Sequence, residues 1–199
     1  MNLRFIRKNR IVVSRIAAII LLMVFVFTRT DIENTFVRVF MNSAGLLLIT
    51  VGAFGRIWSS MFICGYKRRK IIDTGPYAIT RNPLYLFSFI AALGISLTTL
   101  NVIFIILMIM LFIGYYVLVV ISEEKNLERI HGKPYLDYLA NTPRFFPNFK
   151  KFVLPERYDV DVKTYSRAFL DAVWFFVAYV MIDIVKLLQQ QHVIPLVFG

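Results

Sequence analysis

The sequence is poor in charge and in the side chains that bind metals. Of its 199 residues, 18% are charged, one is cysteine and two are histidine. A single cysteine cannot form an internal disulfide, and with so few cysteines and histidines we expect no Cys/His metal site. The sequence also lacks the Gly-x-Gly-x-x-Gly pattern that opens a dinucleotide-binding fold, which excludes a soluble-type cofactor domain.

Hydrophobic residues dominate instead. They make up 58% of the chain and aromatic residues 16%, and the mean hydropathy of +0.67 does not fit a soluble domain. We therefore expect an integral membrane protein whose chemistry takes place at or in the bilayer. The net charge of +11 does not indicate nucleic-acid binding, because Lys and Arg alternate with apolar runs instead of forming one basic face.

Apolar runs long enough to cross a bilayer recur along the chain. A spanning helix needs roughly 20 mainly apolar residues, and this criterion predicts an all-α membrane protein with five spans, at residues 11–27, 39–63, 83–100, 102–121 and 167–188. A short polar turn around Thr98, Thr99 and Asn101 separates the third and fourth spans. These two spans are therefore predicted to form a tight helical hairpin.

Positive charge predicts the orientation of the spans, since short cytoplasmic loops retain Lys and Arg. The basic residues before the first span and in segments 65–82 and 122–166 fall on one side, whereas the other side holds Arg29, Arg38 and Lys186. We expect a single membrane domain over residues 1–199, with both segments and the N-terminus in the cytoplasm and the C-terminus outside. The small size and the lack of eukaryotic sorting signals favour a prokaryotic inner membrane.

The predicted hairpin brings the start of the third span and the end of the fourth to the same depth. Asn82 and Pro83 are typical of a helix start, because Asn is a favoured N-cap and Pro a favoured first residue. A helix N-terminus with Arg81 beside it attracts anions. Glu123 and Glu124 end the fourth span, where carboxylates oppose the helix dipole. A compensating cation is therefore expected nearby, from Arg81 or from a ligand.

The helical period predicts which of these side chains share a pocket. Tyr116 and Glu123 are seven positions apart on one stripe, whereas Glu123 and Glu124 diverge by about 100°. At most one of the two glutamates is expected to point into a pocket with Tyr116.

Charged residues also lie within the apolar spans. Arg56 lies in the second span, where a charge within the membrane is a functional candidate. If that span begins near Phe36, however, Arg56 reaches the cytoplasmic interface as an anchor, and we favour this structural role. Asp183 lies in the fifth span and can pair with Lys186, three residues further along the helix.

An ordered set of motifs surrounds the predicted hairpin. Before it stand Gly75-Pro76-Tyr77 and Arg81-Asn82-Pro83-x-Tyr85, and after it stand Glu123-Glu124-x-x-Leu127, Gly132-x-x-Tyr135-x-x-Tyr138 and Arg144-Phe145-Phe146-Pro147. Over roughly residues 72–148 this set resembles the superfamily of isoprenylcysteine carboxyl methyltransferases and phospholipid methyltransferases. The Arg-x-Pro-x-Tyr element alone also resembles the membrane steroid reductases, whereas the ordered set is more specific.

The resemblance implies S-adenosylmethionine as methyl donor and a lipid or prenyl-like acceptor that enters from the bilayer. The catalytic candidates are Arg81 and Glu124. The cofactor-binding candidates are Tyr77, Asn82, Pro83, Tyr85, Tyr116, Glu123, Glu124, Tyr135 and Tyr138. The superfamily usually has His where this chain has Asn82, so a proton-carrying role is not expected there, and Asn82 is expected to shape the pocket.

The candidate residues also suit the chemistry of this donor. S-adenosylmethionine has a sulfonium, an ammonium and a carboxylate, which suit aromatic faces, a glutamate, and an arginine or helix N-terminus respectively. Tyr85, Tyr116, the glutamate pair and Arg81 offer all three. The basic residues 67–70, Lys150 and Lys151 are expected to hold anionic lipid heads.

The sequence leaves the acceptor open. Arg81 can bind an acceptor carboxylate, as in carboxyl O-methylation, or a phosphate, as in phospholipid amine N-methylation. An amine has to lose a proton, and Glu124 would be the base. A reductase that uses NADPH and a non-catalytic membrane subunit are further alternatives. The glutamate pair and segment 132–147 argue against the reductase, and the third and fourth spans have few of the mid-bilayer polar groups that transport requires.

Overall fold

The computed structural model describes residues 3–28, 32, 34–66, 69–191 and 193. Of the described residues 78% are helical, and no strand occurs among them. The predicted all-α class is therefore confirmed. Arg29, Lys67 and Arg68, which entered the charge argument above, lie outside the described residues.

The long helices follow the predicted spans, and all but one extend beyond them. Four of the spans correspond to α1 (Leu3–Phe27), α2 (Thr35–Ile63), α4 (Pro83–Thr98) and α8 (Val162–Gln190). The exception is α4, which ends at Thr98, within the predicted span 83–100. The fourth span is one continuous helical run, made of α5 (Val102–Leu111), a π-helical turn (Phe112–Tyr116) and α6 (Val117–His131). The helix therefore continues past residue 121, the predicted end of the span, to His131. Short helical pieces complete the fold: α3 (Pro76–Ile79), α7 (Lys133–Asn141) and a 3₁₀ turn (Phe149–Lys151).

Length and composition identify this as a membrane protein. Within the described part of the chain, three helical runs are long and apolar enough to cross a bilayer: Thr35–Ile63, Val102–His131 and Val162–Gln190. Val12–Phe27 and Pro83–Thr98 are apolar but shorter. The five-span topology and the direction in which the chain crosses the membrane stay predictions.

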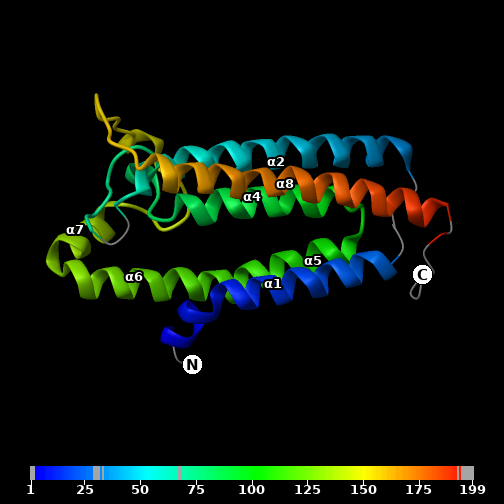
Figure 1. The fold of residues 1–199 in the computed structure, drawn as a ribbon, viewed down its shortest axis with the longest axis horizontal. Helices are drawn as coiled ribbons and strands as arrows, with labels where there is room; N and C mark the ends of the chain where they lie inside the picture. Colours follow the sequence, from blue (N-terminus) through cyan, green and yellow to red (C-terminus); the bar gives the residue numbers. More distant parts are fainter. Residues whose placement is uncertain (1–2, 29–31, 33, 67–68, 192, 194–199) are drawn as a thin grey trace.

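The long helices are arranged in two layers (Figure 1). One layer holds α2, α4 and α8, and the other holds α1 beside the continuous α5–α6 run. A buried apolar cluster joins the layers near the start of α5, made of Leu21, Phe25, Phe104, Ile182 and Val185. At the other end of the bundle, α7 and the loops around it gather together (Figure 1).

The predicted turn between α4 and α5 is present and tight. Leu100 has a positive φ of 57°, and the Asn101 side chain caps α5 by accepting a hydrogen bond from the Phe104 N–H at 2.9 Å. The Asn101 amide also donates to Thr28 Oγ1 at 2.7 Å, which ties the turn to the end of α1. The two arms nevertheless lie in different layers (Figure 1), so the hairpin opens away from its turn.

Glycines explain why α4 packs against α2 and not against its hairpin partner. A Cβ built on Gly52 of α2 would lie 2.5 Å from the backbone nitrogen of Ala91 in α4. A Cβ on Gly94 of α4 would lie 2.6 Å from the carbonyl oxygen of Gly45 in α2. Small residues thus let the two backbones touch, which is the usual way in which helices associate where water does not drive packing.

Replacing Gly52 by alanine should therefore destabilise the protein by about 1–3 kcal/mol, because the new methyl group meets backbone atoms that cannot move aside. Thermal unfolding in detergent measures this change. Gly114→Ala is the matched control, since a Cβ there meets nothing within 4 Å, and it should be neutral or stabilising. Equal responses of the two variants would contradict a backbone contact at Gly52.

Candidate functional site

A buried carboxylate joins three segments of the chain at the end of the bundle opposite the α4–α5 turn. Glu124 of α6 is 5% exposed. Its Oε2 accepts a hydrogen bond from Arg144 Nε at 3.0 Å. The same oxygen forms ion pairs with Arg144 Nη2 at 2.9 Å and with Arg81 Nη1 at 3.6 Å. Its Oε1 accepts from Asn82 Nδ2 at 2.8 Å. The cation expected beside the glutamate pair is thus supplied twice, by Arg81 and by Arg144.

Backbone pairing of two loops holds both arginines in place. The Arg81 N–H donates to the Pro143 carbonyl at 2.9 Å, and the buried Thr80 hydroxyl donates to the Arg144 carbonyl at 3.0 Å. Because these bonds come from the segment just before α4 and the loop after α7, the start of α4 is fixed against that loop.

The predicted side-chain cap at Asn82 is wrong. Helix α4 begins at Pro83 as expected, but the Asn82 side chain makes no capping hydrogen bond. Its amide points instead to Glu124, while its backbone carbonyl accepts from the Tyr85 and Leu86 N–H groups. A hydrogen bond to an ionised carboxylate is roughly twice as strong as a neutral one, so the buried charge takes precedence over the cap.

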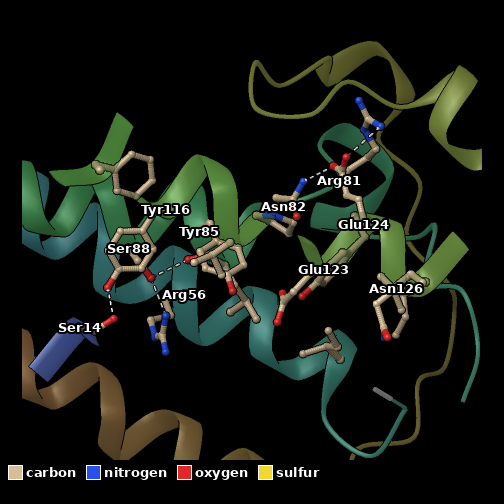
Figure 2. Close-up of a pocket in the computed structure, with 18 of the residues that line it drawn as sticks. Ser14, Arg56, Arg81, Asn82, Tyr85, Ser88, Tyr116, Glu123, Glu124 and Asn126 are labelled. Atoms are coloured by element: carbon tan, nitrogen blue, oxygen red, sulfur yellow. Dashed lines mark hydrogen bonds and ion pairs between the residues drawn. The ribbon is translucent and has the colours of Figure 1, made fainter. Parts of the chain in front are cut away.

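A cavity of about 820 Å³ extends from this charge cluster along the bundle (Figure 2). Its size is within the usual range of small-molecule sites. At one end it is polar, and at the other it is lined by apolar side chains of α1, α4, α5 and α8, among them Leu21, Ala92, Met108, Leu111 and Phe175. Every predicted site residue lines it: Tyr77, Arg81, Asn82, Pro83, Tyr85, Tyr116, Glu123, Glu124, Tyr135 and Tyr138.

Tyr116, Glu123 and Glu124 all line this cavity. Glu124 is directed to Asn82 and Arg81, and Glu123 lies one residue earlier along the cavity wall (Figure 2). The cavity is wide enough that side chains leaving α6 in two different directions both line it. The helical period alone does not reveal the width of the cavity.

Three tyrosines form an aromatic wall at the polar end. Gly132 (φ 59°) turns the chain from α6 into α7, which brings Tyr135 and Tyr138 to the cavity with their ring centroids 5.8 Å apart. The Tyr138 hydroxyl donates to the Tyr77 carbonyl at 2.8 Å. Burial raises the pKa of the hydroxyls of Tyr77, Tyr135 and Tyr138 well above the ordinary value. These side chains are therefore neutral and offer aromatic faces and hydrogen bonds, not a base.

The polar end also has buried polar atoms without a hydrogen-bond partner among the described residues. They are the Tyr77 hydroxyl, Arg81 Nε and His131 Nε2, and all three residues line the cavity. A buried donor or acceptor left unpaired costs about 1–3 kcal/mol. Such atoms are what a site for a polar ligand would present.

The middle of the cavity contains a second group of polar and aromatic side chains. The rings of Tyr85 and Tyr116 lie 6.2 Å apart, and the Tyr116 hydroxyl donates to Ser14 Oγ of α1 at 2.9 Å. Tyr116 closes the π-helical turn, and its ring stacks on Phe112 at the start of that turn. The sequence analysis did not predict this turn.

Two residues of the cavity and the charge cluster, Arg56 and Arg144, were not among the predicted site residues. Arg56 Nη1 donates to Ser88 Oγ at 2.5 Å, and both of these residues line the cavity. Its position inside an apolar span was the available signal. Arg144 belongs to a motif quoted above but was not chosen as a site residue. The predicted pair of Asp183 and Lys186 is confirmed, at 2.6 Å.

The phospholipid methyltransferase family model matches residues 44–134. The resemblance to this superfamily of membrane methyltransferases is thereby confirmed. The matched residues include Arg56, Arg81, Asn82, Glu123 and Glu124, but not α1, α8 or the loop with Arg144.

Two relatives align with nearly the whole chain. The nickel-cobalt-cadmium resistance protein NccN of Alcaligenes xylosoxydans xylosoxydans is 27% identical over 191 residues, which are 96% of this chain and 89% of the relative. The cobalt-zinc-cadmium resistance protein CzcN of Cupriavidus metallidurans is 26% identical over 179 residues, or 90% and 82% of the two chains. No solved structure shows significant similarity.

Replacing Glu124 by glutamine should destabilise the fold, because it leaves two guanidinium groups without their shared carboxylate. We expect a loss of about 3 kcal/mol, near the low end for a broken buried pair, since the Arg144 side chain is 40% exposed. Thermal unfolding checks this against Glu128→Gln, which removes the same charge from the exposed face of α6. Similar stability of the two variants would show that the cluster does not hold the fold together.

Proposed function

We propose that this protein transfers a methyl group from S-adenosylmethionine to a lipophilic acceptor that enters from the bilayer. The observation that best supports this proposal is the single cavity that joins a polar end with unpaired buried atoms to an apolar end between membrane helices. A polar donor and a hydrocarbon acceptor can meet in such a cavity without leaving the protein.

The residues at the polar end fit the three charged groups of the donor. Arg81 has an unpaired Nε and suits the carboxylate, Glu123 suits the ammonium, and the tyrosine faces suit the sulfonium. When bound, S-adenosylmethionine would supply an electrophilic methyl group. The protein would contribute positioning and the exclusion of water, which are sufficient for transfer to an acceptor that is already an anion.

Among the possible reactions, carboxyl O-methylation requires least of the side chains present. Both carboxylate oxygens of Glu124 already accept hydrogen bonds, from Arg144 and Asn82, so Glu124 is better suited to organise the site than to remove a proton. A carboxylate acceptor needs no base, whereas an amine does. Phospholipid amine N-methylation is the second candidate, because the matching family model is that of phospholipid methyltransferases.

The names of the two relatives refer to resistance to nickel, cobalt, zinc and cadmium. Within the described part of the chain, no group of three or more His, Cys, Asp or Glu residues is placed to hold a metal ion. We therefore propose that, if this protein serves metal resistance, it does so by methylating a membrane component. This proposal is tested by growing the host on cadmium with either the wild type or Arg81→Lys as the sole copy of the protein. Loss of cadmium tolerance in the variant supports a role for methylation, and unchanged tolerance contradicts it.

We also propose that basic residues near the polar end of the cavity contact anionic lipid heads. Lys70 Nζ lies 3.9 Å from the centre of the Tyr66 ring, and Lys151 donates to the Asn141 carbonyl. Both lysines thus also bind the protein itself. Exposed Arg69 and Lys150 are better placed for lipid heads.

Calorimetric titration of S-adenosylmethionine into the detergent-purified protein tests the proposed donor. We expect binding by the wild type and binding at least tenfold weaker by Arg81→Lys, because lysine preserves the charge beside Glu124 but loses the planar fork that matches a carboxylate. Arg129→Lys makes the same change on the exposed face of α6 and should leave binding unchanged. NADPH is titrated in parallel.

Heat with NADPH and none with S-adenosylmethionine would favour the reductase alternative. No heat with either ligand, in a protein that unfolds cooperatively, would favour a non-catalytic role.

A further inference from the structure

The positive charges near the cavity differ in how they are compensated. Arg81 and Arg144 share the buried carboxylate of Glu124. Arg56 also lines the cavity, but its hydrogen-bond partner among the described residues is a hydroxyl, that of Ser88. No carboxylate of the described residues forms an ion pair with it, including Asp171 and Glu123, which line the same cavity.

Arg56 lies well inside the bundle. It precedes the end of α2 at Ile63 by seven residues, or about 10 Å at 1.5 Å per residue. Its partner Ser88 follows the start of α4 at Pro83 by five residues, or about 8 Å. An arginine near a helix end would extend its side chain towards water, whereas Arg56 turns to a hydroxyl between two packed helices.

Ser88 fixes the guanidinium without neutralising it. The Ser88 hydroxyl donates its own proton to the Leu84 carbonyl at 2.6 Å, so its oxygen is free to accept from Arg56. A guanidinium has five N–H donors, of which this bond uses one. A charged side chain within a membrane span that lacks a counter-ion usually marks a ligand site.

The surroundings of Arg56 define the shape of such a ligand. Figure 2 shows Arg56 beside Ser88 and Tyr85, with Glu123 and Glu124 further along the same cavity. Apolar side chains such as Leu21, Met108 and Phe175 line the cavity elsewhere. A molecule that fits has an anionic group at Arg56 and a hydrocarbon chain along the apolar wall.

We propose that Arg56 binds the anionic group of the acceptor, and that the acceptor is therefore an anionic amphiphile. This inference rests on the methyltransferase function proposed above. It assigns to Arg56 the role that the sequence analysis gave to Arg81, whose charge is already shared with Glu124. Arg56 sets the depth at which the acceptor lies and so places its reactive group beside the donor.

A carboxylate and a phosphate both fit the planar fork of arginine, and they correspond to different reactions. A carboxylate at Arg56 is itself the group that is methylated. A phosphate at Arg56 is an anchor, and the methyl group then goes to an amine further along the same molecule. Two probes, one with a carboxylate and one with a phosphate, therefore distinguish these two kinds of acceptor.

The test uses the full-length protein in nanodiscs of phosphatidylcholine, with empty nanodiscs as the blank. Tritiated palmitate is compared with methyl palmitate, and lysophosphatidate with monoacylglycerol, so that each anionic probe has a neutral partner of similar chain. We expect the wild type to prefer one anionic probe over its neutral partner by roughly 10- to 100-fold, the usual strength of a hydrogen-bonded charge. Arg56→Gln and Arg56→Met should abolish this preference.

Two controls make the result specific to Arg56. Arg129→Gln makes the same change at an exposed position of α6 that does not line the cavity, and it should leave the preference intact. Binding of S-adenosylmethionine, measured on the same samples, should stay within about twofold of the wild type in the Arg56 variants.

The outcomes separate this inference from the function on which it rests. If the wild type does not bind S-adenosylmethionine, the proposed function fails whatever Arg56 does. If the donor binds but neither anionic probe is preferred, or the preference survives both Arg56 substitutions, the inference about Arg56 is overturned and the methyltransferase proposal stands. Loss of donor binding in both variants would mean that Arg56 supports the fold, and that result also overturns the inference.

Discussion

The burial of one carboxylate, Glu124, is the constraint on which the arrangement of the site depends. Removing a carboxylate from water costs several kcal/mol unless it is surrounded by donors. The donors come from two segments far from α6 in sequence, Arg81 and Asn82 before α4 and Arg144 after α7. The start of α4 and the end of the α5–α6 run are therefore held together, just as their other ends are joined by the turn at Leu100.

Between these two fixed ends the arms of the hairpin separate, and this separation creates the cavity. Helix α4 is drawn to α2 because glycines allow their backbones to touch, while α5–α6 lies beside α1 in the other layer (Figure 1). The cavity is thus a consequence of two competing contacts. The charged groups around Glu124 hold the ends of the hairpin together, and the close packing of α4 on α2 separates its two arms between those ends. If larger residues replaced Gly45 and Gly52, α4 could no longer pack closely on α2. The arms of the hairpin would then have no reason to separate and form the cavity.

The sequence predicted those parts of the fold that depend on local chemistry. Hydropathy located the helices, Pro83 marked the start of α4, and the motif order brought the glutamate pair to the arginine before the hairpin. What it could not predict depends on distant contacts. The Asn82 amide donates to the Glu124 carboxylate instead of capping its own helix, and Arg56 donates to the hydroxyl of Ser88 on another helix. The π-helical turn before α6 likewise had no local signal.

The family model and the two relatives cover different parts of the cavity. The family model covers residues 44–134, which include the segment around Arg81 and most of the polar end. Helices α1 and α8 lie outside that match, yet they contribute Ser14, Leu21 and Phe175 to the cavity wall. The relatives named for metal resistance align over as much as 96% of this chain, so their similarity extends to these two helices. The family match therefore covers most of the polar end of the cavity, whereas the wall contributed by α1 and α8 is covered by the similarity to these relatives.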